Sequence, residues 1–207
     1  MKVFVVGASG RVGQELCQAL IKRGHQVTAG ARHFDSLKGL KLTEVPLDLH
    51  APVAEIADKI GQQDALYFVA GSRGSDVLEI DTYGAIKTMQ AAQLNHISRY
   101  IMLSGYGSLN PSFWEETTIR EYYLGKYLAD NWLIHQTDLD YTILQPGSLT
   151  ETPATGTVAL NVQAAGNNSI SDVARVLAAI PDHDNLIGKV IPMHEGTIPI
   201  DEALAQI

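Results

Sequence analysis

A glycine-rich segment at the start of the chain, residues 1–13, constrains the fold more than any other part of the sequence. Val3 to Val6 form an unbroken apolar run, which is typical of a strand buried on both faces. Glycines follow at positions 7, 10 and 13, and residues 12–23 then show the periodicity of an amphipathic helix. Strand, glycine loop and helix in this order predict a dinucleotide-binding unit.

Each of the three glycines has a separate physical purpose in such a unit. Gly7 permits the tight turn after the strand, Gly10 lets the backbone approach a pyrophosphate, and Gly13 allows the helix to pack closely. The free N–H groups at the start of the helix meet the phosphate charge. The spacing is G-x-x-G-x-x-G rather than the G-x-G-x-x-G of many dehydrogenases, and an ordinary strand–turn–helix is the alternative interpretation.

Composition narrows the possible partners and the cellular location. The net charge of −8 argues against nucleic acid and anionic membranes, which attract clustered Lys and Arg. A single cysteine, Cys17, excludes an internal disulfide, and we expect it in the core. The apolar run of Val3–Val6 is too short for a signal peptide, and no segment has the length of a membrane span, so we expect a cytoplasmic protein. The seven histidines lack metal-site spacing, and no metal is expected.

Apolar runs alternate with helical patterns along most of the chain, which predicts βαβ units. Further strands are expected at 26–31, 44–47, 65–70, 100–103 and 141–144, and helices at 52–60, 80–94 and 114–135. The predicted fold class is α/β: a single Rossmann-type doubly wound domain over residues 1–207, with a mostly parallel sheet and helices on both faces. Ligands of such sheets bind beyond the carboxyl ends of the strands. The loops expected there begin at Gly7, Ala70, Ser104 and Pro146.

Residues 146–207 are expected to form a small C-terminal region that walls the substrate pocket. It would contain strands at 157–162 and 189–193, a helix at 172–180 capped by Ser171, and a last short helix from Pro199.

The end of the second strand indicates the choice of cofactor. An Asp or Glu that would bind the adenosine ribose is missing there, and Arg32 stands in its place. Asp35 is expected to cap a helix instead. Arg32 can hold a 2′-phosphate by a charge-assisted hydrogen bond, which predicts NADP(H) in preference to NAD(H); a solvated surface arginine is the alternative. Arg11, inside the glycine loop, is a second candidate for a phosphate.

Tyr122 and Lys126 form a Y-x-x-x-K pair on one face of the predicted long helix, away from an apolar stripe of Leu124, Leu128 and Trp132. A lysine ammonium favours ionisation of a neighbouring tyrosine, so Tyr122 is a candidate acid for an oxygen that receives hydride. Lys126 could also hold the cofactor ribose, and Ser104 could hydrogen-bond the same oxygen. With eight tyrosines in the chain, a chance Y-x-x-x-K match is the alternative.

Several motifs together resemble the atypical short-chain dehydrogenase/reductases, and among them the small NAD(P)H-binding, NmrA-like set that includes relatives of biliverdin/flavin reductase B. They are G-A-S-G-R-V-G at 7–13, A-G-S-R-G-S-D at 70–76, D-T-Y-G-A-I-K at 81–87, Y-Y-L-G-K-Y-L-A-D at 122–130, D-Y-T-I-L-Q-P-G-S-L-T at 140–150 and I-S-D-V-A at 170–174. The resemblance implies a cofactor site made of Gly7, Ser9, Gly10, Arg11, Val12, Arg32, Asp48, Leu49, Ala70, Gly71, Lys126 and Pro146. Asp48 and Leu49 would flank the adenine.

These patterns predict an NADPH-dependent oxidoreductase that transfers hydride to a small flat acceptor such as a flavin, a quinone or another carbonyl, with Tyr122, Lys126 and Ser104 as the catalytic set. The gap from Ser104 to Tyr122 is longer than in the classical enzymes. Some relatives act as redox sensors, so a non-catalytic NADP(H)-binding regulator with a protein partner is the alternative. A sugar-nucleotide epimerase or dehydratase is less favoured because only about sixty residues follow the sixth strand. A monomer or weak homodimer is expected.

Overall fold

The computed structural model describes residues 1–207, and its centre is a nine-stranded sheet in the order β11-β8-β10-β6-β5-β4-β1-β2-β3. Seven strands are parallel: β1 (Lys2–Val6), β2 (Gln26–Ala31), β3 (Thr43–Pro46), β4 (Ala65–Phe68), β5 (Arg99–Leu103), β6 (Asp140–Pro146) and β10 (Lys189–Glu195). Two short strands are antiparallel to their neighbours, β8 (Thr157–Leu160) and β11 (Ile198–Pro199). The order β3-β2-β1-β4-β5-β6 is that of a doubly wound Rossmann sheet, which confirms the predicted fold class.

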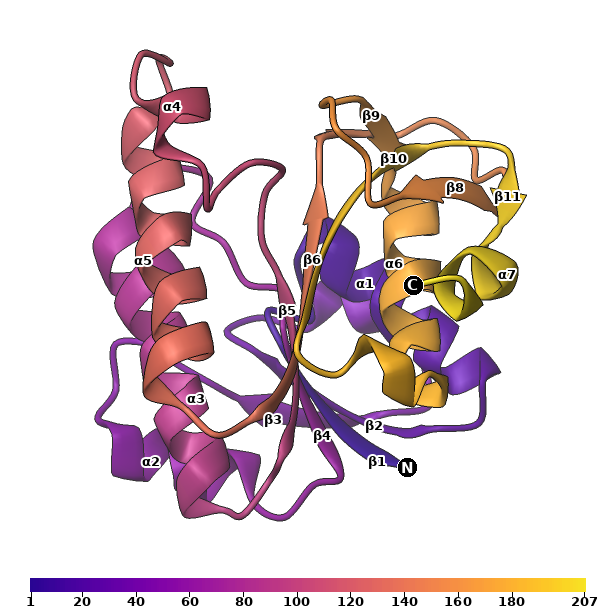
Figure 1. Cartoon of the computed structure of the whole chain (residues 1–207). Coiled ribbons are helices and arrows are strands. Elements are labelled where there is room, and N and C mark those ends of the chain that lie inside the picture. Colours follow the sequence, from indigo (N-terminus) through magenta and orange to yellow (C-terminus); the bar gives the residue numbers. More distant parts are fainter.

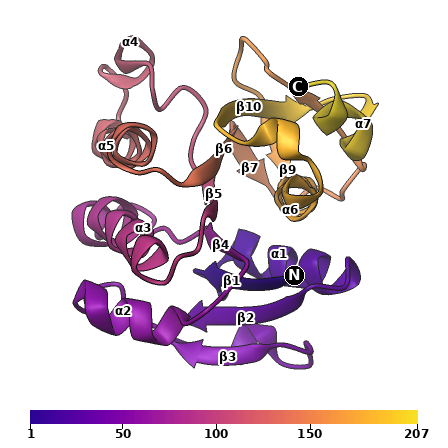
Figure 2. The same ribbon diagram turned by 60° about the horizontal axis from the view of Figure 1, so that its bottom comes forward.

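Helices cover both faces of the sheet, as Figures 1 and 2 show. On one face lie α2 (Val53–Ile60), α3 (Ala85–Leu94) and α5 (Arg120–Gln136); on the other lie α1 (Arg11–Lys22), α6 (Ile170–Ala179) and α7 (Ile200–Ala205). The position of β1 in the sheet explains why its apolar run is unbroken. Val3 and Val5 belong to the core cluster that contains α1 and α6, whereas Phe4 and Val6 belong to the cluster beneath α2 and α3. Both faces of this strand are therefore buried.

Two of the predicted helices are divided in the structure. The segment expected as one helix over 80–94 is an eight-residue π-helix, η2 (Val77–Gly84), followed by α3. The segment expected over 114–135 is a single turn, α4 (Pro111–Trp114), separated from α5. In the intervening segment the N–H and the hydroxyl of Thr117 both donate to the Trp114 carbonyl, at 3.0 and 2.9 Å, and such local bonds compete with helical ones.

The apolar stripe of Leu124, Leu128 and Trp132 does not form the buried face of α5. Leu128 and Trp132 are exposed, and the helix instead buries a mixed face of Gly125, Lys126, Ala129, Asp130 and Leu133. A Cβ atom on Gly125 would lie 2.5 Å from Val77 Cγ1 and 2.8 Å from Thr82 Oγ1, so glycine lets α5 approach η2 closely. Ala129 and Leu133 of this face pack in the hydrophobic core, whereas Lys126 borders the site described below.

The C-terminal region contains elements that the sequence did not indicate. Strands β7 (Ser148–Thr150) and β9 (Asn167–Ser169) form a separate two-stranded parallel sheet, and two 3-10 helices, η3 (Ile180–Asp182) and η4 (Asp184–Leu186), follow α6. The predicted cap of α6 is wrong: Ser169 occupies the N-cap, and Ser171 Oγ donates to Glu15 at 3.0 Å.

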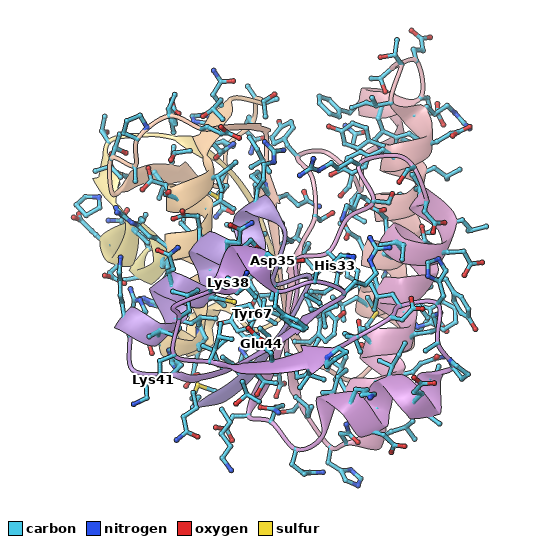
Figure 3. The ribbon with its side chains drawn as sticks, turned by 180° about the vertical axis from the view of Figure 1, so that it is seen from behind. His33, Asp35, Lys38, Lys41, Glu44 and Tyr67 are labelled. Carbon is cyan, nitrogen blue, oxygen red and sulfur yellow. The ribbon has the colours of Figure 1, made fainter.

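The loop after β2 contains a short 3-10 helix, η1 (Asp35–Leu37). Asp35 is its first residue rather than its cap, and its carboxylate pairs with Lys38 at 2.6 Å; Figure 3 labels both residues on this loop.

No helix of the protein combines the length and the hydropathy that a membrane span requires.

Candidate active site

The glycine loop after β1 is shaped by contacts that leave no space for side chains. Gly7 has a φ of 86°, and a Cβ there would lie 2.5 Å from Ala70 Cα. A Cβ on Gly13 would lie 2.2 Å from the Gly7 carbonyl oxygen. Gly10 is the N-cap of α1 and provides no side chain to the first N–H groups of the helix. The loop thus presents backbone and a helix N-terminus, as a pyrophosphate requires.

A cavity of about 820 Å³ lies where the glycine loop meets the carboxyl ends of β2, β4, β5 and β6. It is lined by thirteen of the fourteen predicted site residues: Gly7, Ser9, Gly10, Arg11, Val12, Arg32, Leu49, Ala70, Gly71, Ser104, Tyr122, Lys126 and Pro146. The fold brings these residues together because the carboxyl ends of parallel strands share one edge of the sheet.

Asp48 is the predicted site residue that does not line this cavity. Its carboxylate accepts from His50 Nδ1 at 2.9 Å, and His50 Nε2 lies 2.8 Å from an Asp76 oxygen. These hydrogen bonds to carboxylates raise the pKa of His50, and hydrogen bonds from His50 lower the pKa of Asp48. Through His50, Asp48 therefore links the segment after β3 to Asp76, which precedes η2. The neighbouring Leu49 is the residue that lines the cavity.

Arg32 and Arg11 bring positive charge to the end of the cavity that the glycine loop forms. The exposed Arg32 guanidinium makes no ion pair and no hydrogen bond within the protein, so its donors are available to a ligand. Arg11 is also exposed and lies 3.8 Å from a Glu151 oxygen. An ion pair of this length at the surface is weak and can exchange for a phosphate.

Lys126 is 3% exposed and borders the cavity from α5. Its ammonium donates to the Leu103 carbonyl at 3.4 Å and lies 3.9 Å from Asp81 Oδ1. Asp81 is fully buried in η2, and its second oxygen accepts from the Ser72 N–H at 2.9 Å. The motif at 81–87 contained Asp81, but sequence reasoning gave it no role. Here it provides the negative charge that holds the Lys126 ammonium at the cavity.

Tyr122 also faces the cavity, one turn before Lys126. The Lys126 ammonium lies 5.7 Å from the centre of the Tyr122 ring. A Cβ on Gly105 would lie 3.4 Å from the Tyr122 hydroxyl, so this hydroxyl reaches the loop that directly follows Ser104. The long separation of Ser104 and Tyr122 in sequence therefore does not keep the tyrosine from the site.

Ser104 does not direct its hydroxyl hydrogen into the cavity. Its Oγ donates to Asp130 Oδ2 at 2.6 Å, and Ser108 Oγ donates to the same oxygen at 2.6 Å. Burial raises the pKa of Asp130 to about 6, although the hydrogen bonds and the Lys126 ammonium oppose this. Sequence reasoning missed Asp130. Its position four residues after Lys126 placed it on the same helix face and could have identified it.

Four aromatic side chains and one aliphatic residue form the opposite end of the cavity, which we call the acceptor end: Tyr106, Phe113, Tyr122, Tyr123 and Ile119. The Phe113 ring packs edge-on against Tyr106, at 5.3 Å between ring centres, and against Tyr123, at 5.7 Å. Such walls bind flat apolar molecules by stacking and burial. One end of the cavity is therefore cationic and rich in backbone, and the other is aromatic.

The site residues fit a nicotinamide dinucleotide. The crowded Gly7 turn, the uncapped start of α1 and the unpaired Arg32 suit phosphates, and Lys126 suits a ribose or nicotinamide near Ser104. When bound, such a cofactor supplies a hydride. This chain's residues would bind it, orient it and cover it from water.

Comparisons with known proteins agree with this geometry. A family model described as NAD(P)H-binding matches residues 7–184. The uncharacterised sugar epimerase YhfK of Bacillus subtilis is 35% identical over 216 residues, with 100% of each chain covered. The crystal structure of the oxidoreductase YlbE from Lactococcus lactis has a TM-score of 0.96 at 40% identity, covering 100% of this chain and 96% of that one. A proposed NAD-dependent epimerase/dehydratase from Bacillus halodurans has a TM-score of 0.88 at 32% identity, covering 100% of both. The chain therefore belongs to the NAD(P)H-binding family.

Proposed function

We propose that this protein is an NADPH-dependent reductase that transfers hydride to a small flat acceptor, such as a quinone, a flavin or another carbonyl compound. One observation carries the proposal: a single cavity of about 820 Å³ joins the glycine loop and Arg32 to the aromatic acceptor end. Cofactor and acceptor can therefore share one space, as hydride transfer requires.

The cationic end supports NADP(H) over NAD(H). Arg32 ends β2, where NAD-preferring sites place a carboxylate that accepts from the ribose hydroxyls. A guanidinium has no acceptor for those hydroxyls but matches the oxygens of a phosphate. The unpaired Arg32 supports the assignment, because no internal partner has to be displaced when a phosphate binds.

The acceptor end supports a flat substrate and assigns roles to two residues. The Tyr122 hydroxyl, close to Gly105, can give a proton to an acceptor oxygen. Lys126, held by Asp81, keeps a positive charge beside that oxygen and stabilises negative charge that develops there. A flavin can accept hydride without a protein acid, so Tyr122 would matter for carbonyl compounds and quinones but little for flavins.

The test is a turnover screen that follows the dihydronicotinamide absorbance with FMN, menadione and simple ketones as acceptors. We expect Tyr122→Phe to slow menadione or ketone reduction by about 10²–10⁴-fold, the usual contribution of a general acid, and to leave FMN reduction nearly unchanged. Tyr127→Phe is the matched control, because Tyr127 lies on the same helix but outside the cavity lining. Equal rates in the two variants with every acceptor would remove Tyr122 from the mechanism.

One observation favours a second candidate, a non-catalytic NADP(H) sensor that binds a protein partner. The Ser104 hydroxyl donates to Asp130 and not into the cavity, so one of the predicted catalytic hydrogen bonds is not available in this arrangement. A sensor should bind NADPH without oxidising it in the presence of any acceptor, and a stable partner should copurify with it. Steady turnover with one acceptor of the screen would exclude this candidate.

A further inference from the structure

We propose that Asp130 is a positioning residue that sets the hydrogen-bond direction of Ser104. With Asp130 ionised, Ser104 offers only lone pairs to the cavity. With Asp130 protonated, Ser104 is free to donate to an acceptor oxygen. The catalytic consequence rests on the proposed reductase function, whereas the coupling between the two side chains does not.

The geometry around Asp130 concentrates donors on one oxygen. Oδ2 accepts from Ser104 Oγ at 2.6 Å, from Ser108 Oγ at 2.6 Å and from Gln145 Nε2 at 3.3 Å. The other oxygen, Oδ1, is buried and has no partner. The Ser104 hydroxyl has one hydrogen, and the short bond to a carboxylate is stronger than its contact with Ser108 Oγ at 3.3 Å. That hydrogen is therefore committed while the carboxylate is charged.

Protonation reverses this arrangement. A carboxylic acid has an O–H donor, and a Ser hydroxyl can accept it while its own hydrogen rotates elsewhere. Ser104 lines the cavity, but Ser108 and Gln145 do not. Of the three donors, Ser104 alone can turn its freed hydrogen toward a ligand.

The groups around Asp130 allow the switch at mildly acidic pH. Its neighbours from the loop after β5 and from β6 are the uncharged Ser104, Ser108 and Gln145. The charged neighbour is Lys126 on α5, which is itself paired with Asp81 of η2. Burial outweighs these interactions and brings the pKa of Asp130 to about 6.

Three variants separate this proposal from a purely structural role: Asp130→Asn, Ser104→Ala and Ser108→Ala. The first measurement is the NMR titration of the Asp side-chain carboxyl ¹³C signals in the free protein, with Asp130→Asn to assign the signal. Each serine stabilises the carboxylate by one hydrogen bond, so each alanine variant is expected to raise the pKa of Asp130 further. An Asp130 signal that titrates like a surface aspartate, or that Ser104→Ala leaves unchanged, would overturn the proposal.

The second measurement is the pH profile of kcat/KM with menadione or a ketone. In the wild type we expect a fall of about tenfold per pH unit above the pKa of Asp130, because the fraction of donating Ser104 falls. Ser108→Ala should move this inflection upward together with the NMR titration. Asp130→Asn and Ser104→Ala should both remove it. An inflection that persists in Ser104→Ala would contradict the proposal. Complete lack of turnover would refute the reductase function, and the NMR titration would then decide the coupling alone.

Discussion

The replacement Arg32→Ala is expected to abolish the preference for NADPH while NADH binding stays unchanged. A hydrogen bond from a charged group contributes about 1.5–3 kcal/mol, which corresponds to a loss of roughly 10- to 150-fold in affinity. Arg32 is exposed, and solvent screening places the expected loss near the lower limit, at about tenfold. Because Arg32 makes no ion pair in the protein, its removal should change the unfolding free energy by less than about 0.5 kcal/mol.

The assay is calorimetric titration of each variant with NADPH and with NADH. Arg32→Lys keeps the charge but loses the planar donor pair, so its preference should be intermediate. Lys38→Ala is the matched control: it removes one positive charge from the same loop, but Lys38 lies outside the cavity lining and pairs with Asp35. A ratio of NADPH to NADH affinity that Arg32→Ala leaves unchanged would refute the assignment of the 2′-phosphate. An equal loss for both nucleotides would refute it as well.

Three further predictions concern stability and are measured by urea denaturation. Gly13→Ala should lower the unfolding free energy by about 1–3 kcal/mol, because its Cβ would lie 2.2 Å from a backbone oxygen. This overpacking exceeds the gain in helix propensity, which is at most about 1 kcal/mol. Gly10→Ala is the control and should cost less, since the nearest contact of its Cβ is at 3.2 Å. Gly125→Ala should also destabilise the protein, and unchanged stability would show that α5 and η2 separate easily. The third prediction concerns pH. Asp130 has a pKa of about 6 in the fold but ionises near pH 4 in the unfolded chain. The stability that its protonated form contributes, up to about 3 kcal/mol, should therefore be lost as the pH rises from about 4 to about 6. Asp130→Asn should remove this dependence, and a wild-type stability that rises there with the same slope as the variant would contradict the sign.

The sequence predicted those features that depend on local pattern. The apolar run of Val3–Val6 indicated a doubly buried strand because both side-chain directions are apolar. The glycine spacing predicted the loop, since only a residue without Cβ fits next to Ala70. Parallel topology then placed the loops after Ala70, Ser104 and Pro146 at one cavity. These inferences need no knowledge of side-chain packing.

The buried face of α5 could not be predicted in the same way. Apolar periodicity pointed to Leu128 and Trp132, but the helix buries Gly125, Lys126 and Asp130. A helix that borders a site has its polar groups inside, paired with partners from other elements, so the ordinary rule of an apolar buried face fails there. Those partners, such as Ser108 and Asp81, are distant in sequence, and their contacts follow only from the tertiary structure.

The most direct test of the central claim is a crystal structure of the protein soaked with NADP⁺. We predict that the nucleotide occupies the cavity with its 2′-phosphate within hydrogen-bond distance of Arg32, its pyrophosphate on the glycine loop, and its nicotinamide beside Lys126 and Ser104. A nucleotide bound in the reverse direction, or bound elsewhere on the protein, would contradict this account.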